Sequence, residues 1–125
     1  MAQDFRELLK EVSRHERFGR WFEEINIQGM FTFSVQASDA HASIPPEILD
    51  DVYAYKAFEL QLSQKTVSHI EATGYGAWDT FRKKDWAKRF ERGYIAGVME
   101  APDVPTAVVQ EIFEDLLKYA AEHRM

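Results

Sequence analysis

In residues 30–37, apolar and polar side chains alternate from Phe31 onward. Successive side chains of an extended chain point to opposite faces of a sheet, so one face of this segment is apolar and the other is polar. The apolar face consists of Phe31, Phe33, Val35 and Ala37. The pattern predicts a half-buried β-strand, which needs neighbouring strands on its edges and an apolar layer over one face.

A second alternation covers residues 57–62, where every second side chain is apolar. A short polar connection leads to residues 66–72, which also suit a strand, so the two segments together predict a β-hairpin. One long helix from Pro46 to Leu62 is the alternative, but it would place Lys56 and Glu59 within its apolar rows. The hairpin is therefore the favoured interpretation.

Helices are predicted where apolar residues recur every three or four positions. They cover residues 3–18 (with 21–25 as a further helical turn), a short segment opened by Pro46, residues 79–92, and the segment after Pro105. The last is the most regular, with apolar positions at Val108, Val109, Ile112, Phe113, Leu116, Leu117 and Ala120. Residues 94–100 suit one more strand.

These segments predict an α+β fold: an antiparallel sheet of about four strands with helices packed on one face, in the order α-β-(short α)-β-β-α-β-α. The 125 residues suit a single domain, 1–125. Hydrophobic residues make up 46% of the chain and charged residues 29%, which is typical of a globular protein. The chain has no cysteine, which excludes disulfides and thiolate metal sites. It has no apolar run long enough for a membrane span and no secretory h-region, so we expect a cytoplasmic protein.

One segment is basic although the whole chain carries a net charge of −6. Residues 77–93 contain six basic and three acidic residues, a net charge of +3. Lys84, Lys88 and Arg92 would form one row on a helix over 79–92. The candidate anion-binding residues are Arg82, Lys84, Lys88, Arg89 and Arg92, interleaved with aromatic residues that could stack on bases. The alternative is that the basic residues form a solvent-exposed helix face while the aromatic residues pack on the core. The net negative charge of the chain disfavours nucleic acid as a partner.

Two short motifs combine histidine and a carboxylate at β-strand spacing. They are Asp39-Ala40-His41 and His69-Ile70-Glu71. A carboxylate beside an imidazole orients it and raises its basicity, which is the minimal general-base arrangement. His41, His69 and Glu71 are therefore the candidate catalytic residues, unless they are simply polar residues on the wet face of a sheet.

Tyr75 and Trp78 follow the second motif closely and are the candidates for a ligand pocket. No metal-ligand spacing and no nucleotide-binding glycine pattern occurs in the chain. We therefore expect no metal and no cofactor.

Three functions remain open. The favoured one is a small acidic protein-interaction module (an adaptor, regulator or inhibitor) that forms a homodimer and is not an enzyme. It rests on the absence of a catalytic motif, on an aromatic content of 14%, and on the wide apolar stripe of the last helix. The alternatives are a small-molecule-binding protein or small enzyme with an aromatic-lined pocket, and nucleic-acid or phosphate binding through residues 79–92.

Overall fold

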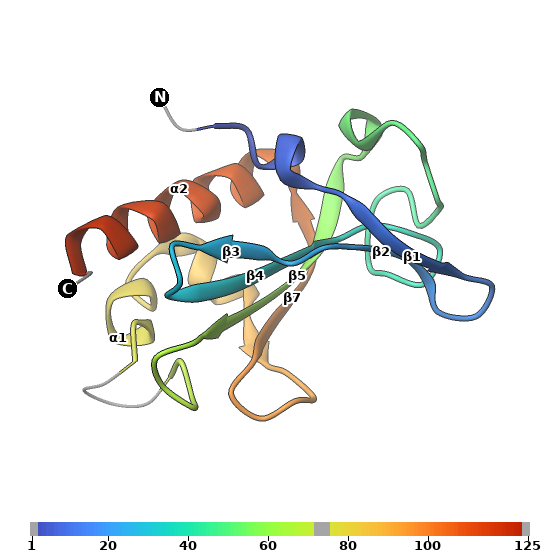
Figure 1. Ribbon diagram of the computed structural model, residues 1–125. Helices are drawn as coiled ribbons and strands as arrows, with labels where there is room; N and C mark the ends of the chain where they lie inside the picture. The colour runs from blue at the N-terminus through green and yellow to red at the C-terminus, as the bar shows by residue number, and fades with distance from the viewer. Residues whose placement is uncertain (1–2, 72–75, 124–125) are drawn as a thin grey trace.

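A five-stranded antiparallel sheet, covered on one face by a long helix, forms the centre of the structure (Figure 1). The computed structural model describes residues 3–71 and 76–123. The strands lie in the order β3-β4-β5-β7-β6. Their bounds are β3 Ile25–Ile27, β4 Phe31–Gln36, β5 Ala57–Gln64, β6 Glu91–Arg92 and β7 Met99–Pro105. The predicted α+β class is confirmed.

Helix α2 (Thr106–His123) supplies the layer that the apolar face of the sheet requires. The predicted helix after Pro105 is therefore confirmed. The buried residues of the two layers form one core, which includes Phe31, Phe33 and Val35 of β4, Leu60 and Leu62 of β5, and Val109, Ile112, Phe113 and Leu116 of α2. The apolar stripe of α2 thus packs within the chain, and the exposed residues of this helix are mainly polar.

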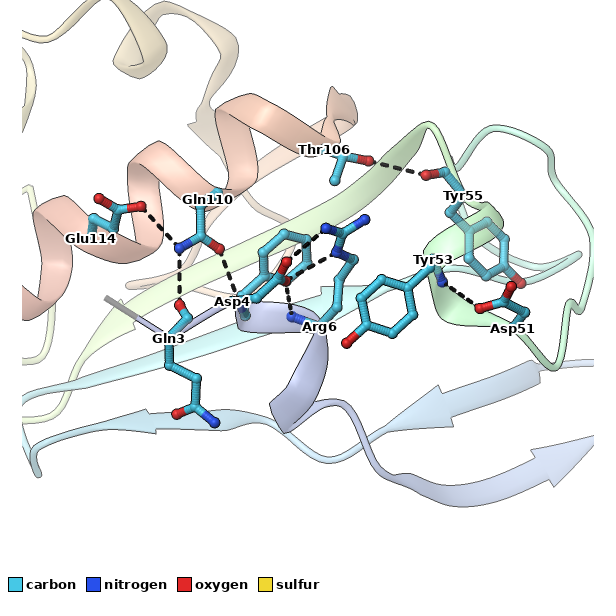
Figure 2. A network of polar contacts seen from close by, with 10 residues as sticks. Gln3, Asp4, Arg6, Asp51, Tyr53, Tyr55, Thr106, Gln110 and Glu114 are labelled. Carbon is cyan, nitrogen blue, oxygen red and sulfur yellow. Dashed lines mark hydrogen bonds and ion pairs between the residues drawn. The ribbon is translucent and has the colours of Figure 1, made fainter. Parts of the chain in front are cut away.

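The N-terminal segment is tied to α2 and to the chain before β5 (Figure 2). It contains the 3₁₀ helix η1 (Phe5–Leu8), whose first turn is capped by Asp4. The side-chain amide of Gln110 on α2 accepts a hydrogen bond from the Phe5 N–H and donates one to the Gln3 carbonyl, both at 2.9 Å. The Arg6 guanidinium lies 4.5 Å from the ring centre of Tyr53. These contacts fix the start of the chain over the edge of the core.

The predicted helix over residues 3–18 is wrong beyond its first turn. After η1 the chain is extended, and β1 (Glu11–His15) pairs antiparallel with β2 (Gly19–Phe22) in a separate two-stranded sheet. The turn between them uses Gly19 at φ 71°, a conformation that glycine adopts without cost. The apolar spacing is a local pattern, whereas the backbone groups on one edge of β1 are paired with residues 19–22, which the spacing does not reveal. Of residues 21–25, predicted as a helical turn, the first two belong to β2 and the last to β3, and residues 23–24 connect the two strands.

The predicted strand over 57–62 is confirmed as part of β5, but its predicted partner is wrong. Residues 66–71 form turns and bends, because β4 and β7 already occupy both edges of β5. Gln64 ends β5 with its side-chain amide: the amide donates to the Thr66 hydroxyl at 3.0 Å and accepts from the Ala77 N–H at 2.8 Å.

Residues 79–92 do not form one helix. α1 (Trp78–Phe81) and the 3₁₀ helix η3 (Asp85–Arg89) are separated at Lys84, whose φ of −82° and ψ of 147° are extended. Five positions separate Phe81 from Trp86, so a continuous helix would send them to different sides. The break returns both rings to one cluster, with centroids 5.4 Å apart.

The predicted strand over 94–100 and the predicted short helix at Pro46 are also wrong in position, because the observed elements begin later in the chain. Residues 93–98 form the loop between β6 and β7, in which Gly97 has φ 85°. The short helical turn begins later, as η2 (Val52–Ala54), with the Asp51 carboxylate accepting from the Tyr53 N–H. Before this turn, Ile44 pairs with Ala57 in an isolated bridge, and residues 45–47 form bends rather than a helix. The sheet system has five strands plus the β1–β2 pair rather than about four strands.

Candidate functional site

His69 and Glu71 line one cavity of about 170 Å³, and Arg92 lines it with them. The cavity therefore joins the predicted histidine–carboxylate pair to one member of the predicted anion-binding set. Its remaining wall is the loop between β6 and β7, through Gly93, Ile95, Ala96, Gly97 and Val98.

Close backbone packing builds this cavity. Ile70 is fully buried and its carbonyl accepts from the Trp78 N–H at 3.2 Å, which fixes the segment that carries His69 and Glu71. On the other side, the Gly93 N–H donates to the Val98 carbonyl at 2.7 Å and closes the loop. A Cβ added to Gly97 would collide with the Ser68 carbonyl oxygen, so glycine is what lets the two segments meet.

The charges in the cavity are unevenly exposed. Nε of Arg92 lies 3.5 Å from Oε1 of Glu71, and the two side chains are 81% and 17% exposed. The second carboxylate oxygen, Oε2 of Glu71, is buried and has no hydrogen-bond partner among the residues described. His69 is exposed, with Nδ1 3.3 Å from the Ser68 hydroxyl. The cavity therefore offers one unused buried acceptor beside an exposed guanidinium.

His41 does not join this cavity. It is buried on the segment that follows β4, where Nδ1 lies 2.6 Å from the Ser38 hydroxyl oxygen. The same hydroxyl accepts from the Ala40 N–H at 3.1 Å, and the ring of Trp21 packs edge-on against the imidazole at 4.4 Å. Asp39 is exposed and makes no hydrogen bond to His41 in the described part of the chain, so the predicted Asp39–His41 pair does not form.

Burial lowers the pKa of His41 below its ordinary value, and the nearby Arg20 guanidinium lowers this pKa as well. Glu59 and Asp39 act in the opposite direction. Nε2 of His41 is buried without a hydrogen-bond partner within the described ranges. Ser38 is completely buried, so the pair stabilises its turn as a neutral hydrogen-bonded unit and gives no substrate access to the hydroxyl.

Arg20 is a buried cation that the sequence analysis missed. Its guanidinium donates to the carbonyls of Leu49 (2.6 Å) and Ala37 (2.8 Å) and to the Tyr55 hydroxyl (2.8 Å). It also lies 4.4 Å from the ring centre of Phe22. No carboxylate pairs with it in the described structure, so its role is to hold three chain segments together. The alternation of Arg20 and Phe22 was the available sequence signal, but the sequence analysis predicted a helical turn over residues 21–25 instead of a strand.

The predicted anion-binding residues do not form a row. Arg82 lies just past α1, Lys88 and Arg89 lie in η3, and Arg92 lies in β6. Two of the lysines form loose ion pairs instead, Lys84 with Asp115 at 3.7 Å and Lys88 with Asp85 at 3.9 Å. The aromatic residues of this segment face the core, so the segment lacks the exposed stacking platform that base binding uses.

Trp78, predicted to line a pocket, packs on the core in a cluster with Phe81, Trp86 and Phe90. The indole N–H of Trp86 anchors this cluster to α2 by donating to Asp115 at 2.7 Å. Tyr75 lies outside the described residues. Within those residues, no three histidine or carboxylate side chains are grouped as a metal site would require.

The β1–β2 hairpin, residues 11–22, is the feature that sequence reasoning missed altogether; we call it the arm. It extends from the end of the sheet that lies away from the C-terminal end of α2 (Figure 1). All five residues of β1 are exposed. Val12 is 62% exposed, Phe18 63% and Trp21 36%, which is unusual for large apolar side chains on one short element.

The base of the arm is firmly held. The Gln36 side-chain amide accepts from the Phe22 N–H at 2.8 Å and donates to the Phe22 carbonyl at 3.0 Å, as a neighbouring strand would. The arm thus combines a fixed base with an exposed outer strand, and β1 keeps one edge free of partners among the described strands.

No protein family, curated protein or solved structure matches this chain. None of the helices in the described ranges has the length and apolar character needed to cross a membrane.

Proposed function

We propose that this chain is a small acidic protein-interaction module and that the arm is its contact element. The observation that carries the proposal is that every residue of β1 is exposed, and that three exposed apolar residues, Val12, Phe18 and Trp21, lie on the arm. A two-stranded hairpin is marginally stable alone, and an exposed strand edge readily adds another strand. The arm therefore gains backbone hydrogen bonds and apolar contact when a third strand joins it.

The partner that we propose is a second copy of the chain. Antiparallel pairing of two β1 strands about a two-fold axis at Ser13 sets Glu11 of each copy opposite His15 of the other. It sets Lys10 opposite Glu16 and Val12 opposite Arg14 in the same way. No two like charges face each other in this register, whereas a register centred on Arg14 would oppose two arginines. An isologous contact of this kind closes as a dimer.

Sedimentation velocity over a range of protein concentrations tests the proposal. We expect a reversible dimer for the wild-type chain. Ser13→Glu and Ser13→Lys should each be monomeric, because each puts two like charges opposite one another at the axis. An equimolar mixture of the two variants should form a heterodimer, because the opposed charges then attract.

Tyr94→Ser is the matched control, since Tyr94 is a fully exposed aromatic residue outside the arm. It should leave the dimer unchanged. A wild-type chain that stays monomeric at every concentration contradicts the proposal, and so does a dimer that survives both Ser13 variants.

A further inference from the structure

The cavity lined by His69, Glu71 and Arg92 places opposite charges in one small space. Carboxylate–guanidinium pairs frequently form two parallel short hydrogen bonds. Here Nε of Arg92 is 3.5 Å from Oε1 of Glu71, while Oε2 is buried without a partner in the described chain. A buried carboxylate oxygen left unpartnered carries a desolvation penalty that a donor from a ligand would remove.

We propose that this cavity binds a free α-amino acid with a small side chain, through its ammonium group on the carboxylate of Glu71 and its carboxylate on the guanidinium of Arg92. The two charged groups of an α-amino acid are adjacent, as are the two charged side chains of the cavity. Each therefore meets its opposite, and no net charge is buried.

Other ligand classes satisfy only half of the cavity. A simple anion would be attracted by the Arg92 guanidinium but repelled by the Glu71 carboxylate. A simple ammonium ion would be attracted by Glu71 but repelled by Arg92. A metal ion would need more ligands, since the described residues contain no group of three histidine or carboxylate side chains.

The size of the cavity selects among amino acids. Pockets for drug-sized ligands occupy roughly 300–1,000 Å³, whereas this one measures about 170 Å³. The lining includes the apolar residues Ile95, Ala96 and Val98 together with Gly93 and Gly97. A methyl-sized side chain suits this wall better than a long or charged one. His69 lies in the lining as a further hydrogen-bonding group for the ligand carboxylate.

Amide chemical-shift titration of the ¹⁵N-labelled protein with L-alanine tests the proposal. We expect saturable shifts centred on the amides of Gly93 and Gly97, with a dissociation constant on the order of 1 mM. Propionate and ethylamine each lack one charged group, so each should bind at least tenfold more weakly than L-alanine. Equal binding of propionate and L-alanine would overturn the proposal in favour of a plain anion site.

Glu71→Gln keeps the shape of the side chain and removes its charge, and Arg92→Gln changes a side chain that is mostly exposed. Each should weaken L-alanine binding tenfold or more. Arg89→Gln is the matched control, because Arg89 is an exposed cation of the same basic segment that does not line the cavity. Unchanged affinity in both cavity variants, or no saturable shift at Gly93 and Gly97 in the wild type, would refute the site. Neither result bears on the arm, which lies elsewhere in the fold.

Discussion

Nδ1 of His41 lies 2.6 Å from the hydroxyl oxygen of Ser38, and both side chains are buried. The contact closes the turn that follows β4, and the ring of Trp21 covers it from the arm. The pair has the hydrogen bond of a serine nucleophile and its base but not the accessibility. Its consequence is for stability, because a buried imidazole resists protonation.

The first prediction is that His41 makes stability depend on pH. Burial lowers the pKa of His41 in the folded protein below its ordinary value of 6.5. The unfolded chain therefore binds this proton more readily, so the free energy of unfolding falls as the pH drops below the ordinary value. The loss stops once the pH lies below the lowered pKa. Urea unfolding at a series of pH values should show a steeper loss for the wild type than for His41→Gln.

His123→Gln provides the comparison, because His123 is exposed at the end of α2 and stacks on Tyr119. The steeper loss should be present in His123→Gln and absent from His41→Gln, because only the second variant removes the buried imidazole. Parallel curves for the wild type and His41→Gln would show that His41 titrates alike in the folded and unfolded chains.

The second prediction concerns Arg20. Arg20→Met keeps an unbranched apolar stem but removes the guanidinium that donates to the carbonyls of Ala37 and Leu49. We expect a loss of about 3 kcal/mol in the free energy of unfolding, measured by urea denaturation. Arg17→Met changes an exposed arginine of the same arm and should stay within about 0.5 kcal/mol of the wild type. Similar losses for the two variants would mean that the buried hydrogen bonds of Arg20 contribute little.

The third prediction separates backbone strain from steric collision at two glycines. Gly29 (φ 77°) and Gly97 (φ 85°) both adopt left-handed conformations, so alanine at either position costs about 1 kcal/mol. An added Cβ has open space at Gly29 but meets the Ser68 carbonyl at Gly97. The free energy of unfolding, measured by thermal denaturation, should therefore be lower for Gly97→Ala than for Gly29→Ala by about 1–3 kcal/mol. Equal losses would show that the loop moves away from Ser68 without cost.

Local pattern and long-range contact explain which parts of the fold the sequence predicts. The apolar residues of 31–36 and of the stripe in 106–123 are buried in the core, so both elements are found where they are predicted. Burial in the first segment extends to its polar residues Ser34 and Gln36, which the alternation does not predict. The arm is different, because residues 11–15 have helical spacing but obtain their backbone hydrogen bonds from residues 19–22. Local spacing cannot reveal a pairing partner.

The candidate site shows the same division. His69 and Glu71 are predicted together because they are neighbours in the chain, and they do share a cavity. Arg92 joins them only through the turn of residues 93–98, which the predicted strand over 94–100 had hidden. Arg20 was missed since an arginine inside a protein is uncommon, and its three acceptors come from distant segments.

The last prediction concerns the attachment of the N-terminal segment to α2 (Figure 2). Gln110 accepts from the Phe5 N–H, donates to the Gln3 carbonyl, and donates to Glu114, each at 2.9 Å. Gln110→Ala removes the acceptor of the Phe5 amide, so hydrogen exchange at this amide should accelerate by about tenfold, as the loss of 1.4 kcal/mol implies. Glu111→Ala, at the next and exposed position of α2, should leave the rate unchanged. If exchange at Phe5 is equally slow in both variants, the burial of its ring rather than Gln110 holds the segment in place.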